Sequence, residues 1–73
     1  MAKKNEDGIY KIVEVVGTSK KSWEDAASNA VATAAKTLRD LRIAEITKLD
    51  MKVEDGKVIA YRARVSLSFK YDK

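Results

Sequence analysis

The chain combines stretches that alternate with the two-residue period of a β-strand and one stretch that repeats with the period of an α-helix. Residues 9–16 are rich in β-branched side chains and are apolar at positions that point to both sides of a strand. We expect a first strand here that ends at Gly17 and is covered on both faces. A single helix can cover only one of those faces, so the other cover has to come from elsewhere.

An amphipathic helix is predicted after the turn residues Gly17-Thr18-Ser19. Ser22 marks its start, because the hydroxyl can accept a free backbone N–H, and Glu24 and Asp25 suit the positive end of the helix dipole. The apolar stripe is mostly alanine: Trp23, Ala26, Ala27, Ala30, Val31, Ala34, Ala35 and Leu38. Small side chains predict a close approach of helix and sheet, with Trp23 used for packing and not as a platform for a ligand.

Two further strands follow the helix. The second is predicted over about residues 42–53, and Glu54-Asp55-Gly56-Lys57 has the composition of a hairpin turn in which Gly56 adopts a positive φ. The third covers residues 59–71, where apolar and polar side chains alternate at every position from Tyr61 to Tyr71. This is the clearest strand pattern in the chain.

The order of elements predicts an α+β fold with a β-α-β-β succession. We expect the first two strands to run in the same direction and the third to lie between them, antiparallel to the second. A strand of about 14 residues spans about 46 Å, whereas a helix of about 18 residues covers about 27 Å. The sheet therefore outreaches its helix, and Leu67, Phe69 and Tyr71 are expected to be the uncovered apolar end that contacts another subunit.

Composition narrows the classes of function. The 73 residues include no cysteine and no histidine, which excludes disulfides, thiolate metal sites and histidine-based catalysis. Together with the lack of a phosphate-binding glycine loop and of an evident nucleophile beside a base, this indicates a protein that is not an enzyme. A chain so short buries little surface alone, so self-association is expected to supply the missing stability.

Charge and hydropathy speak against several partners. Fifteen Lys and Arg residues are interspersed with eleven acids, so no nucleic-acid partner is expected. No apolar run approaches the length of about 18 residues that a membrane span needs, so no membrane is expected and the cytoplasm is the default location. Residues 1–8 are interpreted as a disordered N-terminal leader and residues 9–73 as a single domain.

The motifs in order resemble the dodecin family over about residues 9–71. They are Val16-Gly17-Thr18-Ser19, Ser22-Trp23-Glu24-Asp25-Ala26, Lys36-Thr37-Leu38-Arg39-Asp40-Leu41-Arg42 and Glu54-Asp55-Gly56-Lys57. The resemblance implies a β-α-β-β subunit whose three-stranded antiparallel sheet partly wraps one helix, with twelve copies forming a hollow dodecamer. It also implies a non-enzymatic protein that stores or sequesters a flavin (riboflavin, FMN or FAD) between subunits.

The family's flavin contacts are altered in this sequence. Flavin-binding members stack a tryptophan on the ring and hydrogen-bond its polar edge with a glutamine; here these positions are Ile43 and Arg62. An aliphatic side chain forfeits about 1–3 kcal/mol of stacking per ring, and a guanidinium only donates hydrogen bonds where an amide also accepts them. The chain thus looks most like the tryptophan-lacking, calcium-dodecin-type branch, with flavin or a similar flat aromatic ligand and Ca²⁺ as the alternative ligands.

Candidate site residues follow from the same resemblance and from the alternation of the strands. Ile43, Glu45 and Arg62 are predicted to line a ligand site at a two-fold interface. For Ile43 and Glu45 the alternative is a contact between subunits that holds no ligand. Arg62 and Arg64 are expected to meet either a ligand anion or acids of a neighbouring subunit. Oxygen donors for a hard cation are available on four residues, Glu14, Glu45, Asp50 and Asp55, although no EF-hand loop is present.

Overall fold

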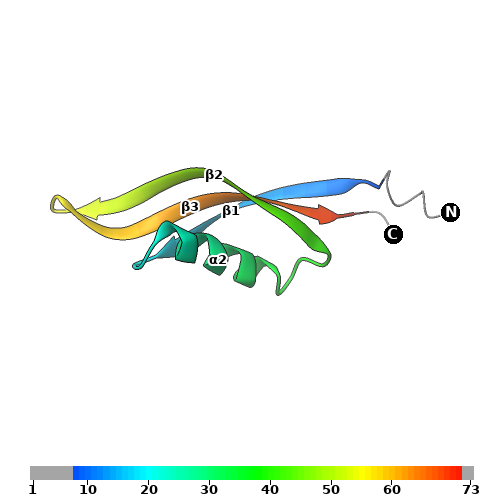
Figure 1. The fold of residues 1–73 in the computed structure, drawn as a ribbon, viewed down its shortest axis with the longest axis horizontal. Coiled ribbons are helices and arrows are strands. Elements are labelled where there is room, and N and C mark those ends of the chain that lie inside the picture. Colours follow the sequence, from blue (N-terminus) through cyan, green and yellow to red (C-terminus); the bar gives the residue numbers. More distant parts are fainter. Residues whose placement is uncertain (1–7, 72–73) are drawn as a thin grey trace.

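The computed structural model describes residues 8–71 and contains three strands and one helix in the expected order (Figure 1). The elements are β1 (Tyr10–Ser19), α2 (Trp23–Ala34), β2 (Leu41–Glu54) and β3 (Lys57–Lys70). The β-α-β-β succession predicted from the sequence is confirmed. β1 continues beyond Gly17, where the sequence pattern suggested that it would end, because Gly17, Thr18 and Ser19 pair with residues 61–63 of β3.

The three strands form one antiparallel sheet in the order β1-β3-β2. β3 is the central strand, as expected, and pairs with β1 from Tyr10↔Lys70 to Ser19↔Tyr61 and with β2 from Leu41↔Phe69 to Glu54↔Lys57. Asp55 and Gly56 form the turn of the β2–β3 hairpin with φ values of 50° and 73°. Both turn residues therefore have the positive φ that matches the twist of a tight hairpin.

The helix begins where the sequence predicted and ends earlier. The Ser22 hydroxyl accepts a hydrogen bond from the backbone N–H of Asp25 at 3.0 Å, which caps the N-terminus. α2 has 12 residues, shorter than the expected helix of about 18, and ends at Ala34. After Ala34 the N–H groups of Lys36 and Thr37 donate to carbonyls three residues back, those of Thr33 and Ala34, so the last turn tightens and the α-helix ends. This correction makes the helix cover even less of the sheet.

A small core lies where α2 crosses the sheet. Its fully or nearly fully buried side chains are Ala26, Ala30, Ala63, Val65 and Leu67. Gly17 is part of this contact, since a Cβ built on it would lie 2.0 Å from the carbonyl oxygen of Ala26. The close approach predicted from the alanine stripe is confirmed.

The sheet extends well past the helix at the end that carries the hairpin (Figure 1). The described chain measures 58 × 20 × 14 Å, whereas 12 helical residues cover about 18 Å. The prediction that Leu67 belongs to the uncovered end is wrong, because Leu67 is fully buried under the helix and only Tyr71 of that group is strongly exposed. A second uncovered region is the hairpin arm, residues 51–58, where Met51, Val53 and Val58 are 45–55% exposed.

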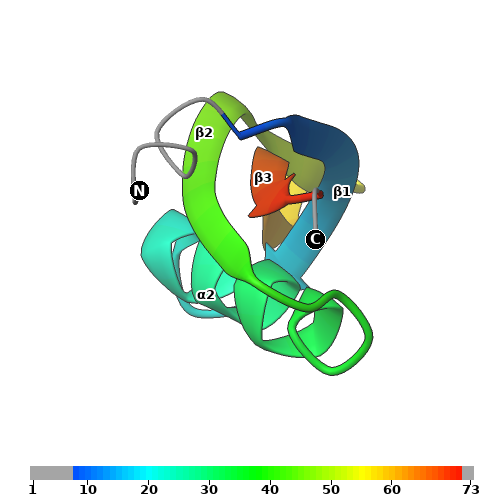
Figure 2. The same cartoon turned by 90° about the vertical axis from the view of Figure 1, so that its right-hand side faces the viewer.

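Figure 2 shows α2 on one side of the sheet, with no helix on the other side. The proposed leader, residues 1–8, lies outside the described residues except for Gly8. No helix in the described part of the chain is long and apolar enough to cross a membrane.

Candidate functional site

The side of the sheet opposite α2, which we call the open face, carries most of the candidate residues. Because directly opposed residues of an antiparallel pair point to the same side, the even-numbered residues of β1 and β3 share this face. The open face consists of Tyr10, Ile12, Glu14, Val16, Thr18, Ile43, Glu45, Lys48, Asp50, Lys52, Val53, Val58, Ala60, Arg62, Arg64, Ser66, Ser68 and Lys70. Its charged side chains are arranged in rows that run across the three strands.

Four successive rows differ in character. The first, Ile12–Ser68–Ile43, exposes two isoleucines, which are 64% and 59% exposed. The second is Glu14–Ser66–Glu45 with two carboxylates; the third is Val16–Arg64–Lys48 with two cations; the fourth is Thr18–Arg62–Asp50 with one charge of each sign. Neighbouring rows are about 7 Å apart along the strands. The face thus carries an acidic row directly beside a basic row.

Ile43 and Glu45 lie next to each other on β2, but Arg62 does not join them within one chain. Ile43 is opposite Ser68, and Arg62 lies six residues away from Ser68 along β3. At about 3.3 Å per residue the separation is about 20 Å. A ligand site that contains Ile43 and Arg62 together therefore needs two copies of the chain.

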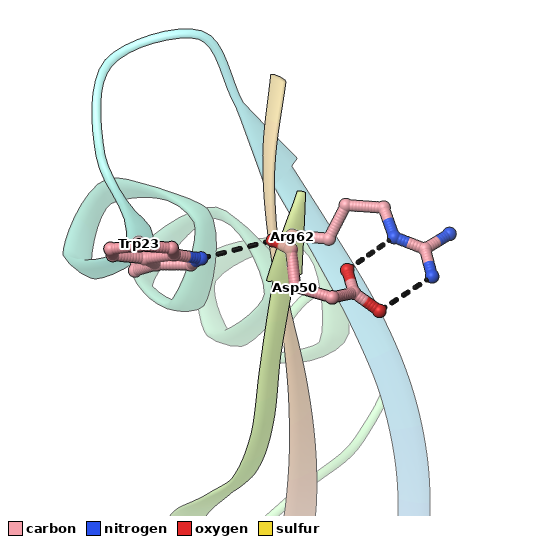
Figure 3. A network of polar contacts seen from close by, with 3 residues as sticks. All are labelled: Trp23, Asp50 and Arg62. Atoms are coloured by element: carbon pink, nitrogen blue, oxygen red, sulfur yellow. Dashed lines mark hydrogen bonds and ion pairs between the residues drawn. The ribbon is translucent and has the colours of Figure 1, made fainter. Parts of the chain in front are cut away.

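Arg62 is engaged within its own chain (Figure 3). Its Nε and Nη2 atoms donate hydrogen bonds to the two carboxylate oxygens of Asp50 at 2.7 and 2.9 Å. The Trp23 indole Nε1 donates to the Asp50 carbonyl at 3.0 Å, and the Trp23 and Tyr61 rings meet edge to face with centroids 5.0 Å apart. Trp23 thus packs between helix and sheet, as predicted. Arg62 has an ion-pair partner inside its own chain, and its expected contact with a ligand or a neighbouring subunit stays a prediction.

The pair shifts the ionisation of both partners. The hydrogen bond from Arg62, reinforced by the positive charges of Arg62 and Arg64, holds the pKa of the Asp50 carboxyl below its ordinary value against a smaller opposing effect of desolvation. The same hydrogen bond raises the pKa of Arg62. Both oxygens of Asp50 therefore accept a hydrogen bond from a charged partner, with which a bound cation would have to compete.

The other acids proposed as cation ligands are dispersed. Glu14 and Glu45 stand on either side of Ser66, with their strands about 10 Å apart. Asp55 lies in the β2–β3 hairpin turn at one end of the sheet, far from Glu14 and Glu45. Within residues 8–71 there is no group of three acids that could hold a metal ion. A calcium ion needs six to eight oxygen ligands, so one chain does not supply them.

Lys48 was not among the residues singled out from the sequence. A strict alternation along β2 from Ile43 and Glu45 would place Thr47 on the open face and Lys48 on the helix side. A register shift between Ile46 and Lys48 changes this, and the Thr47 hydroxyl donates a hydrogen bond to the Arg64 carbonyl at 3.3 Å. The bulge turns Lys48 onto the open face beside Arg64. Nothing in the local sequence marks this shift.

Two apolar grooves flank the helix on the other side of the sheet. The larger, about 520 Å³, lies between α2 and β1, and the smaller, about 340 Å³, lies between α2 and β2. The second contains Val31, Ala44 and Ile46 and exists because α2 sits mainly over β1 and β3. Neither groove contains a charged side chain.

Comparison with known proteins gives one consistent family. The family model described as Dodecin matches residues 9–72. The calcium dodecin of Mycobacterium tuberculosis is 40% identical over 62 residues, covering 85% of this chain and 87% of that protein. The dodecin of Thermus thermophilus is 34% identical over 65 residues, covering 89% and 94% of the two chains. The solved structure of dodecin from Streptomyces coelicolor superposes with a TM-score of 0.85 at 36% identity and covers 92% of this chain and 96% of that one.

Proposed function

Because the chain belongs to the dodecin family of non-enzymatic small-ligand binding proteins, which form dodecamers, we propose that it works as a cytoplasmic dodecamer that binds its ligand between copies and prefers calcium to flavin. One observation carries this preference. At the two positions where flavin-binding members place tryptophan and glutamine, this chain has an exposed Ile43 and an Arg62 that is already bound to Asp50. Neither is suited to hold a flavin ring in the way those members do.

The similarity to calcium dodecin supports the cation. That relative is named for calcium, and its crystal structure is described as containing a calcium-binding site. In the present chain a cation has to collect oxygens from several copies, since residues 8–71 of one copy lack a cluster of three acids. Such a site is built only when the particle assembles, so calcium binding and assembly should be coupled.

Calorimetric titration of Ca²⁺ into chelator-treated protein tests the proposal. We expect saturable heat and an increase in thermal stability when Ca²⁺ is added, with a weaker response to Mg²⁺. Asp55→Asn tests a candidate cation ligand, and Asp40→Asn, at an aspartate that is not a candidate, is its matched control. Asparagine tolerates the positive φ of both positions, 50° at Asp55 and 56° at Asp40. Titration heat that is indistinguishable from dilution would contradict calcium as the ligand.

A flat aromatic ligand is the second candidate, supported by Ile12 and Ile43 on either side of Ser68. Their exposed side chains, 64% and 59%, provide an apolar surface on the open face. This surface lacks the tryptophan platform, so we expect FMN to keep its fluorescence in the presence of micromolar protein. Strong quenching by the unmodified protein would instead identify flavin as a ligand.

The double variant Ile43→Trp/Arg62→Gln sharpens this test. It restores both contacts of flavin-binding members and is expected to quench FMN fluorescence, because the framework around them is unchanged. Ile12→Trp/Arg62→Gln is the matched control, with the tryptophan in the same row but on the other side of Ser68. Equal quenching by the two variants would mean that position 43 has no special relation to the ligand site.

A further inference from the structure

We infer that each chain binds a small multivalent oxyanion, such as diphosphate, on a cluster of four cations next to the hairpin arm. We call this cluster the basic patch; it consists of Lys48, Lys52, Arg62 and Arg64. All four belong to one chain, so the site does not depend on a neighbouring copy. The inference goes beyond the proposed function because it names a second class of ligand, bound by other residues than a cation would use.

The basic patch extends over three successive levels of the β2–β3 pair. Lys48 is opposite Arg64 at the first level, Asp50 is opposite Arg62 at the second, and Lys52 follows on β2 at the third. Neighbouring levels are about 7 Å apart, and opposed residues are about 5 Å apart. The backbone positions of the four cations therefore lie within about 14 Å by about 5 Å. Side chains as long as those of lysine and arginine can converge on one ion across this area.

One carboxylate inside the patch, that of Asp50, offsets part of this charge. Arg62 lowers the pKa of Asp50 through their hydrogen bond, and the charge of Arg64 lowers it further. One carboxylate against four cations leaves the patch with a net charge of +3. Within residues 8–71, no side-chain hydrogen bond or ion pair engages Lys48, Lys52 or Arg64. The patch is therefore an electropositive surface that attracts an anion with more than one charge.

The backbone of β2 departs from regular pairing at the point where it brings Lys48 into the patch. The register shift between Ile46 and Lys48 turns Lys48 onto the open face, directly opposite Arg64. Two like charges in this position destabilise an antiparallel pair. Bulges occur often beside functional sites, where they re-aim a side chain. An anion bound between Lys48 and Arg64 would turn this repulsion into two attractive contacts.

Arg62 is held in one orientation for such a ligand (Figure 3). A guanidinium has five N–H donors, and Asp50 accepts from two of them, on Nε and Nη2. Three donors are left without an acceptor in the described part of the chain. The Asp50 carbonyl is in turn fixed by the Trp23 indole N–H at 3.0 Å. Trp23 thus positions Asp50 and Asp50 positions Arg62, so Arg62 loses little freedom when it binds an oxyanion.

The acidic row limits where on the open face the anion binds. Glu14 and Glu45 lie one level away from Arg64, on the side opposite to Lys52. Their carboxylates repel an anion, which displaces it toward the hairpin arm. Because neighbouring levels are about 7 Å apart, an ion with oxygens at both ends, such as diphosphate, can contact two levels at once. Inorganic phosphate contacts one level and is expected to bind more weakly.

Calorimetric titration of sodium diphosphate into the unmodified protein, freed of divalent cations, tests the inference. We expect saturable binding at physiological ionic strength, with an affinity about tenfold above that for inorganic phosphate. Glycerol 3-phosphate distinguishes the source of the anion: affinity equal to that of phosphate supports a free ion, and higher affinity supports an organic phosphate. Titration of diphosphate without saturable binding would mean that other charges already neutralise the patch, and it would overturn the inference.

A pair of charge-matched variants locates the site. Lys48→Gln/Arg64→Gln removes the first level of the patch and should weaken diphosphate binding by about tenfold or more. Lys36→Gln/Arg39→Gln is the control, since it removes the same charge from exposed residues between α2 and β2, away from the hairpin arm. Circular dichroism checks that both variants are folded. Equal weakening in the two folded variants would indicate attraction by overall charge alone and would contradict a site at the patch.

Lysine footprinting covers the case in which the patch variant does not fold, because it uses the unmodified protein. Lys48, Lys52 and Lys36 are all exposed and can be acetylated by an active ester. Mass spectrometry should show that diphosphate slows the acetylation of Lys48 and Lys52 and leaves that of Lys36 unchanged. Equal rates with and without diphosphate at all three lysines would also overturn the inference. A failed calcium titration leaves this site untouched, and a failed diphosphate titration leaves calcium binding untouched.

Discussion

The covered centre of the sheet and its hairpin arm share the central strand β3, yet they obtain their stability differently. In the centre, Ala63, Val65 and Leu67 are completely buried by a helix that approaches as closely as Gly17 permits. In the hairpin arm, Met51, Val53 and Val58 remain about half exposed. The centre folds against its own chain, whereas the arm keeps apolar surface that its own chain leaves exposed. Five experiments can test this contrast, from the largest expected effect to the smallest.

Gly17→Ala should be the most damaging single change, because the new Cβ would lie 2.0 Å from the backbone carbonyl of Ala26. Backbone cannot give way as a flexible side chain can, so helix and sheet have to separate. We expect a loss of about 3 kcal/mol or more in the free energy of unfolding, measured by chemical denaturation at fixed chain concentration. Unchanged stability would show that the helix is not held as closely as described.

Val65→Ala and Val58→Ala compare the two regions with one residue type on one strand. Val65 is fully buried, so its truncation should cost about 2 kcal/mol. Val58 is 46% exposed within the chain, so its truncation should cost less than about 1 kcal/mol in dissociated protein. If another copy covers Val58 in the assembled protein, Val58→Ala should also weaken assembly, and the stability of the variant should depend less on protein concentration. The same loss of stability in dissociated and in assembled protein would indicate that no copy covers the arm.

Gly56→Ala tests the hairpin arm without touching any contact, since nothing lies within 4 Å of the added Cβ. The cost arises from the positive φ of 73° and should be about 1 kcal/mol. Gly56→Asn is the control, because asparagine adopts this conformation more readily. If Gly56→Ala lowered stability as much as Gly17→Ala, its effect could not come from backbone conformation alone, which would contradict this interpretation.

Trp23→Phe removes the hydrogen bond that joins α2 to β2 next to the hairpin arm, and it keeps an aromatic ring against Tyr61. The Asp50 carbonyl loses the indole donor, which should cost about 1 kcal/mol. Thermal unfolding measured beside Trp23→Leu, which also removes the ring contact, should separate the two contributions. A Phe variant as unstable as the Leu variant would mean that the hydrogen bond, and not the ring, dominates.

The smallest effect concerns pH. Arg62 lowers the pKa of Asp50 in the folded chain relative to the unfolded one, whose ordinary value is 3.8. The stabilisation is therefore fully present above that value and is lost as the pH falls through the lower folded pKa. Asp50→Asn lacks this contribution, so its stability difference from the unmodified protein should shrink below about pH 4. Parallel pH profiles for the two proteins would show that the exposed pair contributes nothing measurable.

Most of the fold could be predicted from local patterns. Four features depend only on residues close together in the sequence: the capping Ser22, the hairpin turn at Gly56, the alanine stripe and the alternation of β3. The helix end was misjudged because Ala35 and Leu38 continue the apolar period although the last turn tightens and the helix ends at Ala34. Leu67 was wrongly assigned to the uncovered end because the lengths of the strands and the helix show that the sheet is longer than the helix. They do not show where along the sheet the helix lies.

The candidate site was less predictable because it depends on register. The pairing of Asp50 with Arg62 and the position of Lys48 both follow from the shift between Ile46 and Lys48, which no residue type in that segment signals. Ile43 and Glu45 could be placed on one side of β2 from alternation alone, and the structure confirms this. Their relation to Arg62 could not be derived from alternation, since Ile43 and Arg62 lie about 20 Å apart within one chain.

The mass of the particle in solution tests the central claim most directly, namely that this chain completes its fold with copies of itself. Light scattering coupled to size-exclusion chromatography of the unmodified protein should give twelve times the mass of one chain, as in its family, and the value should hold on dilution into the low micromolar range. A folded protein that elutes with the mass of a single 73-residue chain at every concentration would contradict the account.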